Sequence, residues 1–291
     1  MSLKFTGMIS MGFKKKALNL ATTSLKSAIQ CVAKDRTAAV CAHLSQALTP
    51  IVTQNTDSGS LKFFCPGTIP EWRARTLLTK EPETIEWINS FASNEVFWDI
   101  GANVGVYSLY AALLGIRCCA FEPAPGNHYI LSRNIELNGF DDRIQSFCIA
   151  FNDESRLDSF YMANTDLGDA ESSFGEARNF KGESFAPKFK QAMLGFTIDD
   201  FIRQFCPISP NHIKIDVDGI EKKIVKGAFE TFSQKSVKSV LVELNIDLEE
   251  CANVVDIMEE YGLTLVKREH AAMFDFGEFS SIYNHIFVRK G

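Results

Sequence analysis

From about residue 95 onward, apolar runs that suit strands alternate with stretches whose apolar positions recur at helical spacing. The expected strands cover residues 96–100, 118–122, 144–151, 212–217 and 239–243, and the expected helices cover residues 104–114, 127–138, 198–205, 220–232 and 248–261. Two further strands, 264–268 and 284–289, follow without a clear helix between them. This order predicts an α/β fold with a mostly parallel sheet, helices on both faces, and a closing hairpin that supplies an antiparallel edge strand.

The first part of the chain has a different pattern. Apolar residues recur three and four apart over residues 13–48, which predicts two helices, the second of them ended by Pro50. The polar stretch at 56–60 indicates a turn or linker. The sequence therefore predicts an N-terminal helical extension over residues 1–55 and one larger domain over residues 56–291. A basic amphipathic helix at a membrane surface is the alternative to an extension packed on the core.

Residues 160–195 interrupt the alternation of strands and helices. They are polar and rich in glycine, a composition that does not suit a buried core. A long connection of this kind inside a domain usually belongs to a functional site. We expect it to cover or border the site.

Composition narrows the classes of partner and compartment. The net charge is -6 without a basic stripe, so the chain is not expected to bind nucleic acid. Its eight cysteines contain no Cys-x-x-Cys pair, which favours reduced thiols and a cytoplasmic setting. No secretory signal is apparent, and the most apolar window, residues 104–121, contains Gly115 and Arg117 and does not suit a transmembrane segment.

A glycine-containing turn between the first expected strand and its helix predicts a ligand site, because ligands bind beyond the carboxyl ends of such strands. The stretch "FWDIGANVGVY" places Asp99 at the strand end and Gly101 and Gly105 in the turn. A phosphate-binding P-loop would require Gly-Lys-Ser/Thr where this chain has Gly-Val-Tyr. A dinucleotide fingerprint would require a second glycine at Asn103, where it makes room for a pyrophosphate. These departures favour a nucleoside ligand without a pyrophosphate.

S-adenosylmethionine is such a ligand, and polar residues suit each of its parts. Asp99 would meet its ammonium group, directly or through water, and the backbone amides of Gly101, Ala102, Asn103 and Gly105 would hold its carboxylate. Glu122, followed by Pro123, ends the second strand 21 residues after Gly101, the spacing at which an acid binds ribose hydroxyls. After the third strand, Asn152 or Asp153 would meet the adenine amino group, and Asn152 is favoured because Asp153 suits a solvated turn. Glu81 would reach the methionine end, or would simply be an acid at a helix N-terminus.

Acidic residues also follow the fourth strand, in "KIDVDGIE". We expect Asp216 to act as the acid or base on the acceptor side, with Asp218 and Glu221 supporting it. The structural alternative is a turn at Asp218-Gly219 and a helix start capped by Glu221. Carboxylates and an amide on neighbouring strands could instead hold Mg²⁺, which would lower the pKa of an acceptor hydroxyl.

Five segments together resemble the FkbM-type family of S-adenosylmethionine-dependent methyltransferases. They are "FWDIGANVGVYSLYAA", "AFEPAPGNHYILSRNIELNG", "FTIDDF", "HIKIDVDGIEKKIVKGA" and "VLVELN", in the family's order over about residues 80–245. The resemblance implies a class I methyltransferase fold, which is Rossmann-like, and O-methylation of a hydroxyl, often on a sugar or polyketide. Asp218 departs from the family, which usually carries Glu at this position. The aspartate side chain is shorter, so its carboxylate extends less far toward a bound ligand than that of the family's glutamate.

The residues and the resemblance lead to one main hypothesis and two alternatives. The main hypothesis is O-methylation of a hydroxyl on a small molecule, sugar or glycan, with S-adenosylmethionine as methyl donor. An NAD-dependent dehydrogenase is the second enzymatic interpretation, and Asn103 argues against it. A catalytically silent scaffold that binds the cofactor is the third.

Overall fold

The computed structural model describes residues 3–290, with side chains described from Lys16 onward. By internal contacts it divides into a unit that ends at Pro50 and a unit that begins at Ile51. In the first unit, helix α1 (Leu3–Ala33) is joined to α2 (Thr37–Leu48) by a 3₁₀ turn, η1 (Lys34–Arg36). The predicted pair of N-terminal helices is therefore confirmed. Within the described residues, no helix combines the length and the apolar character that crossing a membrane requires.

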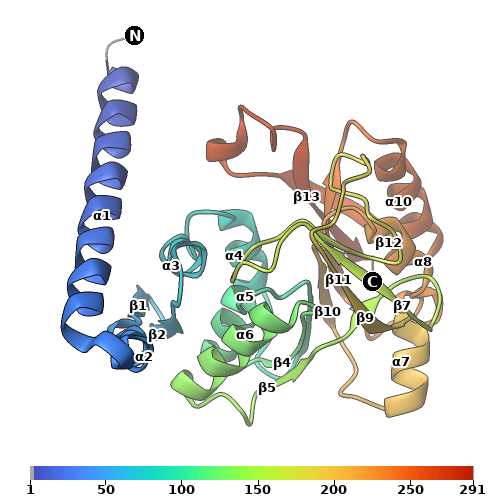
Figure 1. The fold of residues 1–291 in the computed structure, drawn as a ribbon. Helices are drawn as coiled ribbons and strands as arrows, with labels where there is room; N and C mark the ends of the chain where they lie inside the picture. The colour runs from blue at the N-terminus through green and yellow to red at the C-terminus, as the bar shows by residue number, and fades with distance from the viewer. Residues whose placement is uncertain (1–2, 291) are drawn as a thin grey trace. The chain divides into compact units, whose positions relative to one another are not determined.

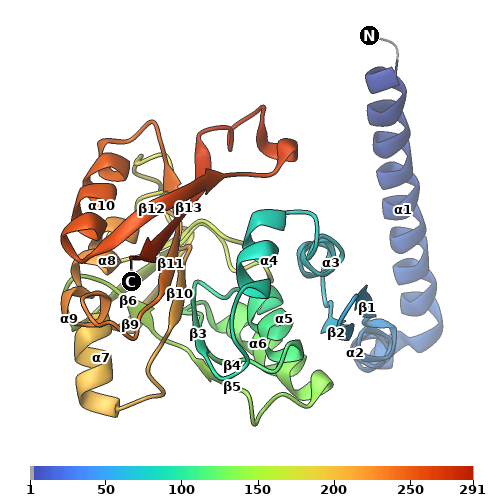
Figure 2. The same cartoon turned by 180° about the vertical axis from the view of Figure 1, so that it is seen from behind.

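The second unit is built on a seven-stranded sheet, in the order β12-β13-β11-β10-β3-β4-β5 (Figures 1 and 2). Its strands are β3 (Val96–Ile100), β4 (Arg117–Phe121), β5 (Ile144–Phe147), β10 (His212–Ile215), β11 (Ser239–Asn245), β12 (Leu263–Glu269) and β13 (Ile282–Arg289). The first five run parallel, and β13 runs antiparallel to both β11 and β12. The predicted α/β fold is confirmed. The expected position of the antiparallel strand was wrong: β13, not the edge strand, is the reversed one, and it is inserted between β11 and the edge strand β12.

Helices cover both faces of this sheet (Figure 1). One face carries α4 (Pro82–Asn89), α5 (Val106–Leu113) and α6 (Pro125–Asn138); the other carries α7 (Ile198–Phe205), α8 (Glu221–Lys226), α9 (Phe229–Phe232) and α10 (Glu249–Glu260). Neighbouring strand residues face opposite sides, so Phe97 packs under the first group and Trp98 under the second. Both faces are apolar, which is why the strands read as continuous hydrophobic runs.

A second, four-stranded sheet differs from the sequence expectation. It consists of β6 (Ala150–Phe151), β9 (Phe189–Phe196), β7 (Arg156–Met162) and β8 (Ser172–Phe174) in that order. Much of it lies in residues 160–195, which we expected to stay outside the core. Phe160, Met162, Phe174 and Met193 are instead buried in the core. The expectation was wrong on this point because each of these strands buries only one or two apolar side chains, too few to dominate its sequence.

Two other expected elements are divided. The strand expected at 144–151 breaks after Phe147, so that β6 joins the second sheet. The helix expected at 220–232 breaks at Gly227, where a Cβ would lie 2.4 Å from the backbone oxygen of Asn152. Close packing of the chain against this glycine explains the break.

The beginning of the second unit is not helical. Strands β1 (Ile51–Thr56) and β2 (Gly59–Phe64) form an antiparallel hairpin, and α3 (Thr68–Arg75) follows. The side chain of Asn134 on α6 accepts a hydrogen bond of 2.7 Å from the backbone amide of Phe64. This bond ties the hairpin to the main domain and brings α3 toward the carboxyl ends of the strands.

Candidate active site

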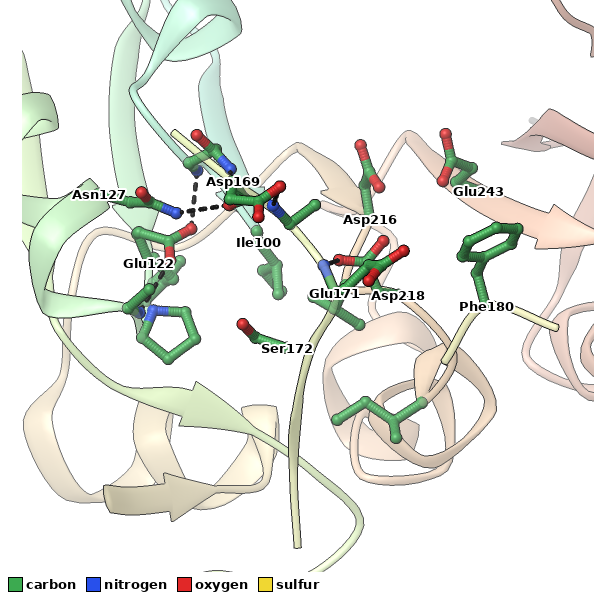
Figure 3. A pocket seen from close by; sticks show the side chains of 18 of the residues that line it. Ile100, Glu122, Asn127, Asp169, Glu171, Ser172, Phe180, Asp216, Asp218 and Glu243 are labelled. Carbon is green, nitrogen blue, oxygen red and sulfur yellow. Dashed lines mark hydrogen bonds between the residues drawn. The ribbon is translucent and has the colours of Figure 1, made fainter. Parts of the chain in front are cut away.

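A cavity of about 460 Å³ opens at the carboxyl ends of β3, β4, β10 and β11. One end is lined by Glu122, and the wall continues past Asp216 and Asp218 to Glu243 and Phe180 (Figure 3). Its size and position are those of a small-molecule site at the switch point of a doubly wound sheet. The segment 160–195 borders it, as expected, through residues 160, 169–172, 174 and 180.

Gly101 and Gly105 are needed for close packing of the turn after β3. Both have positive φ, +87° and +85°, which side chains rarely adopt. A Cβ on Gly101 would lie 1.8 Å from the backbone oxygen of Asp216, and one on Gly105 would lie 2.4 Å from Leu131 Cδ1. The turn is thus packed against β10 on one side and α6 on the other.

The backbone amides of this turn are largely engaged within the chain. Gly101 and Ala102 both donate to the Phe121 carbonyl, and Gly105 donates to the Ala102 carbonyl. The Asn103 amide donates to Glu122 Oε2 at 2.8 Å. All four amides that were expected to hold the cofactor carboxylate therefore already donate to groups of the protein.

Glu122 is fixed at one end of the cavity by the backbone. Its Oε2 accepts from Asn103, and its Oε1 accepts from the Ala124 amide at 2.8 Å. Burial raises the pKa of Glu122 to about 7, although these two amides favour the carboxylate. Each oxygen keeps a lone pair that can accept a further hydrogen bond from a ligand. Pro123 lines the cavity beside it.

Four predicted cofactor residues do not line the cavity: Asp99, Ala102, Gly105 and Asn152. Asp99 is 1% exposed, and its Oδ2 accepts from Ser108 Oγ at 2.6 Å while Oδ1 has no protein partner. Burial raises its pKa above the ordinary value. The Asn152 side chain is fully buried and has no hydrogen-bond partner for either polar atom. At these two strand ends, Ile100 and Phe151 line the cavity instead.

Three carboxyl groups form a cluster on the floor of the cavity: Glu81 at the start of α4, Asp216 after β10 and Glu243 on β11. One oxygen of each lies within 4.8 Å of the others. Burial, followed by the neighbouring Asp216 carboxylate, raises the pKa of Glu243 well above its ordinary value. We call these three groups the carboxyl cluster.

Two lysines balance the carboxyl cluster. Lys214 Nζ lies 2.5 Å from Asp216 Oδ2, and Lys80 Nζ lies 2.5 Å from Glu81 Oε1. Burial alone would raise the pKa of both acids, but the two ammonium groups hold the pKa values of Glu81 and Asp216 below the usual range. Within the described residues, Glu243 is the member of the cluster that makes no ion pair.

The remaining two predicted catalytic residues have different surroundings. Asp218 lines the cavity, and its Oδ2 accepts from the Glu171 amide at 3.0 Å. Burial, reinforced by Asp216, raises the pKa of Asp218 to about 6. Glu221 does not line the cavity; its carboxylate accepts from the amides of Val217 and Gly219 at 3.1–3.2 Å. Glu221 therefore fits the structural interpretation, an acid that caps the start of a helix, better than a role among the reacting groups.

The sequence comparison identifies the family. A sequence model described as the methyltransferase FkbM domain matches residues 99–264, more than half of the chain. The chain belongs to the FkbM methyltransferase family. This FkbM protein is thereby an S-adenosylmethionine-dependent methyltransferase, and the dehydrogenase interpretation is set aside. Among curated proteins, methyltransferase sdnD of Sordaria araneosa is 29% identical over 178 residues, which cover 54% of this chain and 68% of the relative.

Solved structures similar to this FkbM methyltransferase are distant. A crystal structure of methyltransferase FkbM from Methylobacillus flagellatus is 16% identical with a TM-score of 0.46, over 76% of this chain and 52% of that one. The chain thus spans about half of that protein. P. horikoshii TYW2 in complex with MeSAdo is 13% identical with a TM-score of 0.43, over 81% and 69%. M. capricolum TrmK in complex with S-adenosyl-homocysteine is 9% identical with a TM-score of 0.41, over 72% and 68%.

Several wall residues of this FkbM methyltransferase escaped the sequence analysis. Lys80 lines the cavity and Lys214 is buried close to it, and nothing in their spacing along the sequence shows that both contact the carboxyl cluster. Asn284 on β13 is 3% exposed, and its Oδ1 has no partner, while its Nδ2 donates to Glu83 Oε1 at 2.8 Å. It faces Glu243 across the strand pair, which only the β11–β13 register reveals.

Proposed function

We propose that this enzyme transfers the methyl group of S-adenosylmethionine to a hydroxyl oxygen of a small molecule, sugar or glycan. The observation that carries the proposal is Asp218, a carboxyl that lines the cavity and has a pKa close to neutrality. A hydroxyl must lose its proton when its oxygen attacks a methyl group. A base with a pKa near the working pH accepts that proton most effectively.

The cofactor is proposed to lie along the cavity with its ribose at Glu122. The free lone pairs of that carboxylate suit the two ribose hydroxyls. Apolar side chains beside it, including Phe121, Phe151 and Phe174, suit the adenine ring. Since the turn amides are engaged, the cations Arg73 and Lys80 in the wall suit the cofactor carboxylate better.

In the proposed reaction the acceptor oxygen attacks the methyl carbon as the carbon–sulfur bond breaks, and S-adenosylhomocysteine leaves with the electron pair. The acceptor proton passes to Asp218 and then to water. Holding the oxygen and the methyl group close and collinear supplies much of the acceleration. No metal ion is needed in this scheme because the carboxylate takes the proton.

Asp216, which the sequence favoured as the base, suits that role less well. Its pKa is held below the usual range by Lys214 and Lys80, so its affinity for a proton is low. We assign it instead to the floor beside the cofactor. Asp218 has one carboxylate oxygen, Oδ1, free of protein donors for an acceptor hydroxyl.

A cytoplasmic setting is part of the proposal. All eight cysteines are free, and Cys65, Cys118 and Cys119 are buried. Burial raises the pKa of Cys119 to about 12, so this thiol stays protonated and unreactive. Reduced, buried thiols are typical of proteins kept in a reducing compartment.

The test is transfer of labelled methyl from S-adenosylmethionine to a panel of sugars and other hydroxylated compounds, with amines as the comparison. We expect transfer to a hydroxyl compound and, with that acceptor, a rate that falls as the pH drops through about 6. Asp218→Asn should lower kcat by roughly 10²–10⁴-fold while cofactor affinity stays the same. Glu171→Gln is the control, because the hydrogen bond to Asp218 comes from the backbone amide of Glu171, which this substitution keeps.

Transfer only to amines would contradict O-methylation. Cofactor binding without transfer to any compound in the panel would favour the silent scaffold. Unchanged kcat in Asp218→Asn would remove Asp218 as the base.

A further inference from the structure

Lys214 is a buried lysine on the central strand β10. Its side chain is 1% exposed, and lysines are almost never buried this completely unless they are paired. Its Nζ lies 2.5 Å from Asp216 Oδ2, 4.0 Å from Glu81 Oε2 and 5.0 Å from the centroid of the Tyr107 ring. The ammonium therefore contacts two members of the carboxyl cluster and the face of an aromatic ring.

The carboxyl cluster has the donor atoms of a divalent-cation site. Its three oxygens lie within 4.8 Å of one another, and carboxylate oxygens are the ligands that Mg²⁺ and Mn²⁺ prefer. Two of the three acids are already paired with cations, Asp216 with Lys214 and Glu81 with Lys80. A divalent ion bound here would face two ammonium groups at short range, in surroundings where water screens charge poorly.

We propose that Lys214 is the resident cation of the carboxyl cluster: its ammonium occupies the place that a divalent ion would take, so the enzyme works without a metal ion. Lys214 is a positioning residue in this account. The part of this proposal that concerns methyl transfer rests on the proposed function. The part that concerns ion binding does not depend on it.

Asp216, which Lys214 positions, also contacts the turn after β3, residues 101–105. The backbone oxygen of Asp216 lies so close to Gly101 that no Cβ fits between them. The ammonium holds the Asp216 side chain, and the Asp216 backbone supports the turn. Without the ammonium, three carboxyl groups would lie close together with Lys80 as the remaining compensating charge, a combination that favours uptake of a divalent ion.

The experiment is a titration of the whole 291-residue chain with Mn²⁺, in which the electron paramagnetic resonance signal reports the free ion. The variants are Lys214→Met and, as matched control, Lys238→Met, which also removes a lysine paired with a buried acid, Glu95, but away from the cavity. Wild type and Lys238→Met should leave the signal unchanged. Lys214→Met should bind one Mn²⁺ at least about tenfold more tightly than the wild type, so that it lowers the free-ion signal at concentrations where the wild type does not. Glu243→Gln in the same background should weaken this binding.

Two results would overturn the proposal. One is a wild-type protein that binds one Mn²⁺ and loses it when Glu243→Gln is introduced. The other is a folded Lys214→Met protein that takes up no Mn²⁺. If circular dichroism shows that Lys214→Met does not fold, Lys214→Gln replaces it, because the amide can still donate to Asp216 without charge. Since Mn²⁺ binding is measured without turnover, a wrong acceptor class would leave this result standing.

Discussion

The two ends of the cavity hold their acids by different means. At one end, backbone amides of Asn103 and Ala124 hold Glu122, and no cation contacts it. At the other end, Lys80 and Lys214 hold Glu81 and Asp216 through ion pairs. Burial raises the pKa of Glu122 despite its backbone donors, whereas at the other end the ammonium groups outweigh burial and lower the pKa values of Glu81 and Asp216.

This difference gives the two ends opposite responses to pH. An acid whose pKa is lowered by folding stabilises the folded state above its ordinary pKa, and this stabilisation is lost as the pH falls. An acid whose pKa is raised by folding binds its proton more tightly in the folded state, so stability falls as the pH rises toward its folded pKa. Glu81 belongs to the first kind and Glu122 to the second.

The largest expected effect on stability comes from Gly101, where the turn after β3 packs against Asp216 of the carboxyl cluster. Gly101→Ala places a methyl group 1.8 Å from the Asp216 carbonyl oxygen, so we expect a loss of about 3 kcal/mol or more in the free energy of unfolding. Gly115→Ala is the matched control, because Gly115 has the same φ of +87° and nothing within 4 Å of its Cβ position. It should cost only about 1–2 kcal/mol. Urea unfolding measures both; equal losses would mean that the close contact is unimportant.

The next effect concerns the ion pairs. Lys80→Met leaves Glu81, which is 3% exposed, with Lys214 at 4.0 Å as its nearest cation, and we expect a loss of about 2 kcal/mol at pH 7. The loss should shrink as the pH falls below 4.5, where the wild-type pair is also weakened by protonation. Lys223→Met removes a half-exposed pair with Glu176 and should cost less than about 1 kcal/mol. Similar losses in both variants would contradict the special role of the buried pair.

The smallest effect is expected at Glu122. Between pH 6 and 8 the wild type should lose on the order of 1 kcal/mol relative to Glu122→Gln, because over this range the unfolded chain has already ionised Glu122 while the folded protein keeps the proton until about pH 7. Parallel stability curves for the two proteins over this range would show that Glu122 is ionised throughout.

Local sequence patterns revealed where the site lies and several of its residues, but not which acids are paired with cations. Asp99, Gly101 and Glu122 were found because a turn between a strand and a helix, and an acid at the next strand end, leave a readable spacing. The same spacing could not show that Asp99 is turned toward Ser108 and away from the cavity. That orientation depends on the packing of α5 under β3.

Contacts between distant segments account for what the sequence analysis missed. Lys80 precedes α4 and Lys214 lies on β10, so their meeting at the carboxyl cluster depends on how α4 covers the sheet. Asn284 reaches the cavity only because β13 is inserted next to β11. The strands at 156–162 and 189–196 pair across a long, polar connection, which hides their few buried residues.

Calorimetric titration with S-adenosylhomocysteine, with NAD as the comparison, tests the central claim most directly: the cofactor binds in this cavity with its ribose at Glu122. The wild type should bind S-adenosylhomocysteine and not NAD, and Glu122→Ala should weaken binding by about tenfold or more, as expected for the loss of hydrogen bonds to a charged group. Equal affinity in the wild type and Glu122→Ala would contradict the proposed position of the cofactor.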